Sequence, residues 1–460
     1  MKPVLNKAPN DNGKFVVNDV MISIIGNKTM IIKITRSALL MLSTPDVKYC
    51  LFHYRQSRFD LFKIIFVCPI GYIEEQIKRI GRGLRVKILH LNAGNETGGG
   101  MYHILRMLGK FKEAGSVSCV LGVMERAELY QRAKAANIET IYFENGTRFS
   151  MPLLRKIEQF IRKENITHVH THGPRANVYM NMLKKKVKIP WIVTVHSDPF
   201  FDFQDKGLYG KLLTRLHLQS LKNADRIISV CHAFYPALAN AGVNTNLMRT
   251  VHNGIDFLEE IGTEFSLEEP QNFREQLGFL PNDFLFIKVA RLESVKGHCL
   301  AIRAFAELMK SESENVHLLL LGDGSLKNKL MQLVEQLDLK GHVHFFGERK
   351  DIDRFYKIAN VTLLTSLSES FPYVLLESAR AKTPVISTNV GDVEQLIYQD
   401  ELGWKVATSD MDGLVEAMRE AVCLHADGLR QMGQRLYSYA SSNFSLDKCA
   451  NEVYNVYKRI

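Results

Sequence analysis

The residues whose types and spacing most clearly suggest chemistry are two carboxylates, Glu369 and Glu377, with seven residues between them. An apolar run before them predicts a strand, and Pro372 suits the first turn of the helix that should follow. Glu369 would then lie in the loop and Glu377 inside the helix. Because a helix amino terminus favours a phosphate, the carboxylates could accept hydrogen bonds from hydroxyl groups on either side of it. The pattern suits a diphosphate with a polyol at each end, although a solvated glutamate is the ordinary alternative for either residue alone.

Two cations, Arg291 and Lys296, lie at another predicted junction between a strand and a helix. Arg291 comes directly after a buried apolar run, and Lys296 precedes Gly297 at the start of the next helix. Arginine and lysine at such a junction can neutralise a diphosphate. Solvation of a helix would not explain an arginine in that position.

A glycine-rich stretch, 92–100, separates the first predicted strand of the main body from a helix that starts near Met101. Glycines let the backbone approach a ligand. The stretch matches neither a dinucleotide fingerprint nor a P-loop, so a tight structural turn remains an equal alternative.

Several histidines fall at predicted strand ends. His168, His170 and His172 alternate and would share one face of a strand, which could suggest a metal. Because no cysteine or carboxylate cluster accompanies them, we expect no metal site. His196 ends another buried strand and is better placed to face a cleft, with a satisfied structural histidine as the alternative.

The elements that must position these residues repeat along the chain. Short apolar runs alternate with turns and helical stretches, and continuous Val, Ile and Leu predict parallel strands buried on both faces. Two such series, separated by the loop-like stretch 253–272, predict two doubly wound α/β domains with ligands at the carboxyl ends of the strands. The predicted strands are 86–91, 116–121, 166–170, 191–196 and 226–230, then 284–289, 316–321, 342–346, 361–364 and 384–387.

Composition narrows the class of protein. The 460 residues are 46% apolar and 23% charged, which is ordinary for a globular chain of two or three folding units. No apolar run reaches the ~18 residues of a membrane span, and the first residues do not resemble a signal peptide. The seven cysteines are scattered without a Cys-x-x-Cys pair. We therefore expect neither disulfides nor a zinc site, and a cytoplasmic location.

Residues 1–83 do not join the α/β pattern. They hold 13 Lys and Arg against 6 Asp and Glu, so most of the net charge of +10 lies there. Because the rest of the chain is close to balanced in charge, its composition gives little indication of nucleic acid binding. The apolar stretches 30–42 and 61–73 have no clear partner. The segment is either a basic extension that touches an anionic membrane or a mis-assigned start, with the natural chain beginning near Val86.

The carboxyl-terminal half resembles family 4 of the retaining glycosyltransferases, bacterial ones in particular. The elements that carry the resemblance are Ala290-Arg291-Leu292 with Lys296-Gly297, the Glu369 to Glu377 element with Phe371-Pro372 inside it, Asn253-Gly254-Ile255-Asp256, Gly322-Asp323-Gly324 and Asn389-Val390-Gly391-Asp392. In the amino-terminal half, Val169-His170-Thr171-His172-Gly173 and Thr194-Val195-His196 follow the pattern of the family. The match covers roughly residues 84–460, and the Glu–Glu element is its specific part.

The resemblance implies a GT-B fold, with two doubly wound Rossmann-like domains facing a cleft. Residues 84–255 would form the acceptor-side domain and residues 256–445 the domain that binds a nucleotide sugar. Residues 446–460, with a helix at 446–457, would cross back to the first domain, and residues 1–83 stay unassigned.

The resemblance also implies roles for single residues. Arg291 and Lys296 would bind the donor diphosphate, Glu377 the ribose, and Glu369, with the backbone amides near Ser370 and Phe371, the sugar hydroxyls. Further positions are Gly347, Glu348 and Arg349 at the border of the base, and Gly98, Gly99 and His196 at the reacting centre. Ala290 and Ser370 stand where the family usually has glycine, and neither change removes a charge.

The implied activity is transfer of a hexose or N-acetylhexosamine from a nucleotide diphosphate sugar to a hydroxyl acceptor, with retention, in bacterial surface polysaccharide or glycoconjugate assembly. A nucleotide-sugar epimerase and a non-catalytic nucleotide-sugar binding protein are the alternatives. Two Asp-x-Asp sequences, 351–353 and 410–412, could hold a metal, but both open predicted helices, where Asp caps free N–H groups. We therefore expect no metal dependence and no cofactor.

Lysines 184–186 and 188 close a predicted helix. Their position at a helix carboxyl end is favourable by itself. Because the family often glycosylates lipid-linked acceptors, contact with anionic lipid headgroups is the alternative that the resemblance adds.

Overall fold

The computed structural model describes three strands within residues 14–34 and residues 86–460, except 116, 145–149, 201, 204–206, 259–268 and 312–314. The chain forms two compact units, Met1–Arg85 and Val86–Ile460. In the first unit, β1 (Lys14–Val17), β2 (Val20–Ile25) and β3 (Thr29–Ile34) make an antiparallel sheet in which Val20 is opposite Ile34. The prediction that the apolar stretch from Met30 lacks a partner is therefore wrong for residues 30–34. The stretch 61–73 lies outside the described residues.

The second unit begins with a sheet of seven parallel strands in the order β10-β9-β8-β7-β4-β5-β6. We call residues 86–255 the seven-stranded half. Its strands are β4 (Lys87–Asn92), β5 (Ser118–Val123), β6 (Thr140–Tyr142), β7 (His168–His172), β8 (Trp191–Val195), β9 (Arg226–Ser229) and β10 (Met248–Thr250). Its α-helices are α3 (Gly99–Ala114), α4 (Glu128–Ala135), α5 (Met151–Lys163), α6 (Pro174–Val187), α7 (Gly207–Asn223) and α8 (Tyr235–Asn240).

A second parallel sheet of six strands has the order β13-β12-β11-β14-β15-β16. We call residues 256–445 the six-stranded half. Its strands are β11 (Phe284–Val289), β12 (Val316–Leu321), β13 (Val343–Gly347), β14 (Val361–Leu364), β15 (Val385–Thr388) and β16 (Trp404–Val406). Its α-helices are α9 (Glu269–Gln276), α10 (His298–Leu308), α11 (Lys327–Gln336), α12 (Ile352–Ile358), α13 (Tyr373–Arg380), α14 (Val393–Leu396), α15 (Met411–Cys423) and α16 (Ala426–Asn443).

The predicted fold class, two doubly wound α/β sheets, is confirmed. The bounds of β11, β12 and β14 agree with the prediction to the residue, and the other predicted strands are shifted at their ends by a few residues. The sequence pattern missed β6, β10 and β16, which have three residues each. All three are edge strands of their sheets, where a short strand needs no long apolar run.

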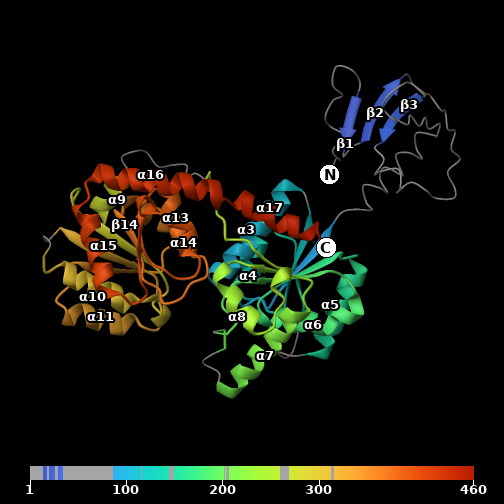
Figure 1. Cartoon of the computed structure of the whole chain (residues 1–460), viewed down its shortest axis with the longest axis horizontal. Coiled ribbons are helices and arrows are strands. Elements are labelled where there is room, and N and C mark those ends of the chain that lie inside the picture. Colours follow the sequence, from blue (N-terminus) through green and yellow to red (C-terminus); the bar gives the residue numbers. More distant parts are fainter. Residues whose placement is uncertain are drawn as a thin grey trace. The chain divides into compact units, whose positions relative to one another are not determined.

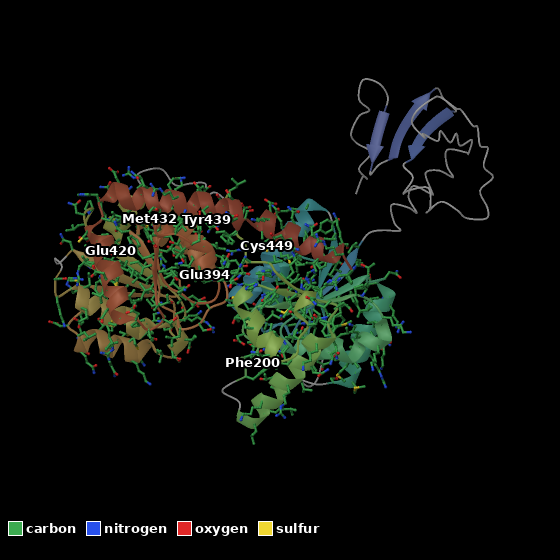
Figure 2. The ribbon with its side chains drawn as sticks, in the orientation of Figure 1. Phe200, Glu394, Glu420, Met432, Tyr439 and Cys449 are labelled. Atoms are coloured by element: carbon green, nitrogen blue, oxygen red, sulfur yellow. The ribbon has the colours of Figure 1, made fainter. Side chains whose placement is uncertain are left out.

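The last helix, α17 (Leu446–Tyr457), packs on the seven-stranded half, beside α3 (Figure 1). Its Cys449, labelled in Figure 2, belongs to a buried apolar cluster with Ile88, Ile192 and Val251. Ser445 caps α17 by accepting a hydrogen bond from the N–H of Lys448, and Ile255 forms a bridge with Ser445. The strand-like link at Ile255 and the entry to α17 therefore lie side by side where the two halves join.

None of the helices in the described part of the chain is both long and apolar enough to cross a membrane.

Candidate active site

Lys296 and Glu369 form an ion pair beyond the carboxyl ends of β11 and β14. Lys296 Nζ lies 2.6 Å from Oε1 of Glu369, and the hydroxyl group of Ser366 donates to the same oxygen at 2.7 Å. The two side chains of the pair are 22% and 14% exposed. The contact joins the two sequence elements that we predicted to bind a diphosphate and a sugar.

Two glycines with positive φ let these loops approach each other. A Cβ at Gly297, where φ is +66°, would lie 1.8 Å from the carbonyl oxygen of Thr365. A Cβ at Gly391, where φ is +58°, would lie 2.1 Å from the carbonyl oxygen of Ser370. Only glycine fits at both positions. The close approach of the loops that carry Lys296 and Glu369 therefore depends on Gly297 and Gly391.

Glu377 lies inside α13, as predicted, whereas Pro372 is the residue just before that helix and not in its first turn. Nη2 of Arg106, in α3, lies 3.5 Å from Oε1 of Glu377. The guanidinium of Arg106 also lies 4.8 Å from the centre of the Tyr373 ring. Burial raises the pKa of Glu377, and the charges of Arg106 and Arg380 oppose that rise. The seven-stranded half thus brings a cation to this carboxylate.

The other predicted donor-site residues of the six-stranded half also follow strand ends. Arg291 is exposed, two residues after β11, and Glu348 is exposed after β13. Gly347 ends β13 with φ +67°, and Arg349 donates two hydrogen bonds, of 2.8 and 2.7 Å, to the carboxylate of Asp351. Within the described residues, no side-chain bond joins Arg291, Glu348 or Arg349 to the Lys296–Glu369 pair.

The glycine-rich loop before α3 brings Gly99 to the six-stranded half. A Cβ at Gly99 would lie 3.7 Å from the ring of Tyr373, whereas a Cβ at Gly98 would have no atom of the described residues within 4 Å. Glu96 of the same loop was not predicted. Burial raises the pKa of Glu96, and a hydrogen bond from Asn92 partly offsets the rise.

His196 directly follows β8 and is linked to the six-stranded half through two side chains. Its ring centre lies 4.9 Å from that of His103. Nδ1 of His103 lies 3.1 Å from Oδ1 of Asn253, whose Nδ2 donates to the carbonyl oxygen of Phe371 at 2.8 Å. Phe371 is one of the residues predicted near the sugar, so these contacts connect it to His196.

Asp392, in the loop after β15, binds the seven-stranded half at several points. Its carboxylate accepts hydrogen bonds from the backbone N–H groups of His232 and Ala233, at 2.6 and 3.0 Å, and from Nε2 of His252 at 2.7 Å. The thiol of Cys231 donates to it at 3.1 Å. Burial by itself would raise the pKa of Asp392, but these hydrogen bonds outweigh it and lower the pKa to about 2.

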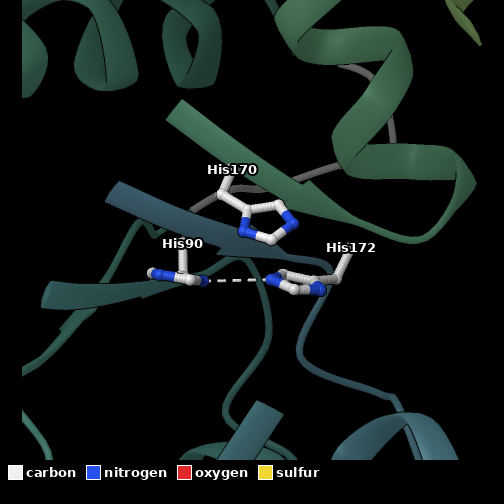
Figure 3. A group of neighbouring side chains, drawn as sticks. All are labelled: His90, His170 and His172. Atoms are coloured by element: carbon white, nitrogen blue, oxygen red, sulfur yellow. Dashed lines mark hydrogen bonds between the residues drawn. The ribbon is translucent and has the colours of Figure 1, made fainter. Parts of the chain in front are cut away.

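Three fully buried histidines, His90, His170 and His172, place their ring nitrogens within 4.8 Å of one another (Figure 3). All three predicted histidines lie at alternating positions of β7, but only His170 and His172 belong to this cluster, and His90 of the adjacent β4 is its third member. His170 bonds the hydroxyl groups of Tyr457 and Thr194 at 2.7 Å each, and His172 uses both nitrogens on other histidines. Since these bonds occupy the nitrogens that an ion would need, the arrangement favours a hydrogen-bonded cluster over a metal site.

The two Asp-x-Asp sequences have separate local roles. Asp410 caps α15 by accepting a hydrogen bond from the N–H of Gly413, as predicted. The capping prediction is wrong for Asp351. Its side chain accepts hydrogen bonds from the guanidinium of Arg349 and none from a backbone N–H of the helix. Asp353 accepts a hydrogen bond of 2.7 Å from Arg380. An arginine two residues away offered Asp351 a stronger, charged donor than a backbone N–H.

Lys288 was missed although its position carried a signal. It is a lysine inside the apolar strand β11 and is 1% exposed. Burial, reinforced by the charge of Lys296 and opposed by that of Glu369, lowers its pKa to about 7. A buried amine is therefore close enough to the Lys296–Glu369 pair for both charges to act on its pKa.

The chain matches two family descriptions. Residues 97–257 match Glycosyltransferase Family 4, and residues 270–438 match Glycosyl transferases group 1. Every predicted site residue lies inside one of these two ranges.

Among curated proteins, the chain is similar to the uncharacterized glycosyltransferase MJ1059 of Methanocaldococcus jannaschii, with 30% identity over 51% of this chain and 58% of that protein. It is 24% identical to the N-acetyl-alpha-D-glucosaminyl L-malate synthase of Bacillus anthracis, over 67% of this chain and 79% of that protein. It is also 24% identical to the UDP-Gal:alpha-D-GlcNAc-diphosphoundecaprenol alpha-1,3-galactosyltransferase of Escherichia coli, over 67% and 77% of the two chains.

Solved structures share the fold. HepE of Anabaena, in complex with UDP, superposes with a TM-score of 0.71 at 19% identity, over 81% of this chain and all of that one. The sucrose-phosphate synthase of Thermosynechococcus elongatus gives a TM-score of 0.66 at 19% identity, over 82% and 99% of the two chains.

Proposed function

Since the chain belongs to glycosyltransferase family 4 and has the GT-B fold, we propose that it transfers a hexose or N-acetylhexosamine from a nucleotide diphosphate sugar to a hydroxyl acceptor, with retention of the anomeric configuration. The Lys296–Glu369 pair is the observation that carries this proposal. It sets a cation suited to a phosphate beside a carboxylate suited to sugar hydroxyls, as the reaction requires.

The donor would lie along the carboxyl edge of the six-stranded sheet. Arg291 and Lys296 neutralise the diphosphate, and their charge stabilises it as the leaving group. Glu377 accepts hydrogen bonds from the ribose, Glu369 and the amides near Ser370 and Phe371 hold the sugar, and residues 347–349 border the base. Gly98, Gly99 and His196 face the reacting centre from the seven-stranded half. A uracil nucleotide is the first donor to test, because HepE is described in complex with UDP and UDP-glucose.

We propose that the reaction needs no metal ion. Three carboxylates of the two Asp-x-Asp sequences have other partners: Asp351 binds Arg349, Asp353 binds Arg380, and Asp410 accepts from the N–H of Gly413. Activity should survive a chelator such as EDTA, and its loss with recovery on adding Mg²⁺ or Mn²⁺ would refute this part.

The acceptor, in this proposal, is a lipid-linked glycan of surface polysaccharide or glycoconjugate assembly, reached by peripheral contact with a cytoplasmic membrane face. The Escherichia coli relative is named for an acceptor of this kind, alpha-D-GlcNAc-diphosphoundecaprenol. Helix α7 supports the contact, since it exposes Leu208, Leu212 and Leu216, which are 85%, 52% and 40% exposed, beside Lys211 and Arg215 and carries no acidic residue.

The predicted lysines at the end of α6 support the contact less strongly. Lys184 already pairs with Asp225 at 2.7 Å, so part of this group has a structural role, while Lys185 and Lys186 are exposed. Sedimentation with vesicles rich in anionic lipid tests the contact. Leu212→Ser should reduce binding, and Met331→Ser, at an exposed apolar residue of α11, should not.

The activity itself is tested with a panel of UDP-, GDP- and ADP-sugars. Thermal shift reports donor binding, and release of the nucleoside diphosphate with an acceptor reports turnover. Arg291→Ala and Glu377→Gln should reduce the shift markedly, whereas Arg303→Ala and Glu394→Gln, at exposed sites on α10 and α14, should retain it. Conversion of the donor without an acceptor would indicate an epimerase, and binding without turnover a non-catalytic protein.

A further inference from the structure

A line of three histidines runs inward from the candidate site. Nε2 of His196 lies 3.1 Å from Nδ1 of His172, and Nε2 of His172 lies 3.1 Å from Nδ1 of His90. Figure 3 shows the inner bond of the line, with the ring of His170 above it. His90 and His172 are fully buried, and His196 is half-buried at the end of β8.

Neutral imidazoles in such a line cannot choose their tautomers independently. Burial holds the pKa of all three rings well below the ordinary value, so each carries one ring proton at neutral pH. Every bond of the line needs one N–H donor and one bare nitrogen. The proton position on His90 therefore fixes the proton position on His172, which in turn fixes that on His196.

The hydrogen bonds of the line can run in either of two directions, with His90 as the first donor or as the last acceptor. The surroundings of His90, at the inner end, select between them. Nε2 of His90 is buried, and no group of the described residues forms a hydrogen bond with it. A buried N–H without an acceptor is the rarer and costlier arrangement, so Nε2 is bare and the proton is on Nδ1 of His90. Neighbouring His103 agrees with this rule. Asn253 donates through Nδ2 and so accepts from His103 Nδ1 through its oxygen, which leaves the buried, unpartnered Nε2 of His103 bare.

We propose that His172, oriented by His90, is a positioning residue that holds His196 in the Nδ1–H tautomer, so that His196 presents a neutral hydrogen-bond donor to the site. His90 donates to His172, His172 donates to Nε2 of His196, and the proton of His196 is left on Nδ1. Within the described residues, no protein group takes that N–H. Its ligand is then an acceptor atom such as a sugar oxygen, a step that rests on the proposed function.

The ring ¹⁵N shifts of the wild-type protein test the order directly, with histidine labelled and His196 assigned by the signal lost in His196→Gln. A proton on Nδ1 of His196 is expected, and a proton on Nε2 would overturn the proposal. This measurement needs neither a variant that folds nor a known substrate.

The second arm replaces the donor of the line. His172→Phe should release His196, whose proton then moves in part to Nε2, while Tyr457→Phe, which removes only a partner of His170, should leave the His196 signals unchanged. If His172→Phe leaves His196 entirely in the Nδ1–H form, the line does not control it and the proposal fails.

Turnover separates this inference from the proposed function. In His172→Phe we expect about ten-fold slower transfer with an unchanged thermal shift by the nucleoside diphosphate, since one hydrogen bond to the sugar is weakened. An equal loss of the transfer rate and of the thermal shift would mean that His172 acts only through folding. A wild-type protein with the expected tautomer but without transfer from any nucleotide sugar would refute the function and leave the histidine order standing.

Discussion

Arg106 and Glu377 are 271 residues apart in the sequence, and Nη2 of Arg106 lies 3.5 Å from Oε1 of Glu377 in the structure. The charge of Arg106 counteracts the burial that raises the pKa of Glu377. Because the proposed hydrogen bonds to the ribose need a carboxylate, Arg106 extends the range of pH in which Glu377 can bind the donor.

This relationship predicts a pH dependence of donor affinity. Affinity should fall as the pH drops through the raised pKa of Glu377, and Arg106→Ala should move the fall to higher pH. Glu377→Gln should remove the dependence and weaken binding about ten-fold or more, as expected for hydrogen bonds to a charged group. Titration calorimetry across the acid range measures this, with Arg303→Ala as control. If donor affinity falls at the same pH in Arg106→Ala as in the wild-type protein, the prediction is contradicted.

Asp392→Asn should destabilise the protein. The carboxylate takes four hydrogen bonds from the seven-stranded half, which an amide with a single acceptor oxygen cannot satisfy. Its pKa of about 2 lies below the ordinary 3.8, so its contribution is present above about pH 4 and is lost as the pH falls towards 2. The shift corresponds to roughly 2 kcal/mol. Urea unfolding at pH 7 and pH 3 tests this.

Asp427→Asn is the matched control for that experiment. Asp427 pairs with Arg430 on the surface of α16, and both side chains are more than three quarters exposed. We expect a change below about 0.5 kcal/mol at either pH. A loss in Asp392→Asn no larger than in this control would show that the contacts of Asp392 contribute little.

Gly297→Ala should destabilise the protein and impair the site together. Beyond the cost of positive φ, which is ~1 kcal/mol, the new methyl group would collide with the carbonyl oxygen of Thr365. We expect a loss of about 3 kcal/mol or more and much weaker donor binding, because Lys296 is the adjacent residue. At Gly278, where φ is +86°, a Cβ would have no atom of the described part of the chain within 4 Å, so Gly278→Ala isolates the cost of φ. Equal losses would contradict the collision.

The buried histidines predict instability in mild acid. Burial lowers the pKa of His90 to about 3 and of His103 to about 4, and holds His170, His172 and His196 well below 6.5. Below about pH 6.5 the unfolded chain takes up protons that the folded chain refuses, so stability is full above that pH and falls below it. Each group adds up to about 1.4 kcal/mol per pH unit.

Urea unfolding between about pH 7 and about pH 4.5 measures this slope. His90→Phe should make the slope shallower by up to about 1.4 kcal/mol per pH unit, even if the variant is less stable throughout. His425→Phe, which changes the residue preceding α16, should leave the slope unchanged. A stability that stays flat over this range would contradict the prediction.

The sequence predicted those parts of the fold that depend on local pattern. Long apolar runs gave β11, β12 and β14 to the residue, and the helix at 446–457 agrees with α17. The prediction for Asp351 was wrong because helix capping was considered without the nearby cation of Arg349. The row of His170 and His172 was visible, but His90 comes from another strand, and only the register of β4 against β7 places it opposite His170.

The candidate site was predictable only within each half of the chain. Glu369 and Lys296 belong to recognisable motifs, and the structure pairs them. Arg106 and the partners of Asp392 act across 271 and about 160 residues of sequence, and no local spacing marks them. Such contacts depend on how two separately patterned sheets meet, which periodicity does not encode.

The position of α17 has a consequence for synthesis on the ribosome. The apolar cluster formed by Ile88, Ile192 and Val251 is completed by Cys449, Val453 and Val456, which are translated only after the whole six-stranded half. The seven-stranded half, although made earlier, must wait with an uncovered apolar face until α17 leaves the exit tunnel. A nascent chain stalled before residue 446 should therefore hold this half in a form that proteases cut and chaperones bind.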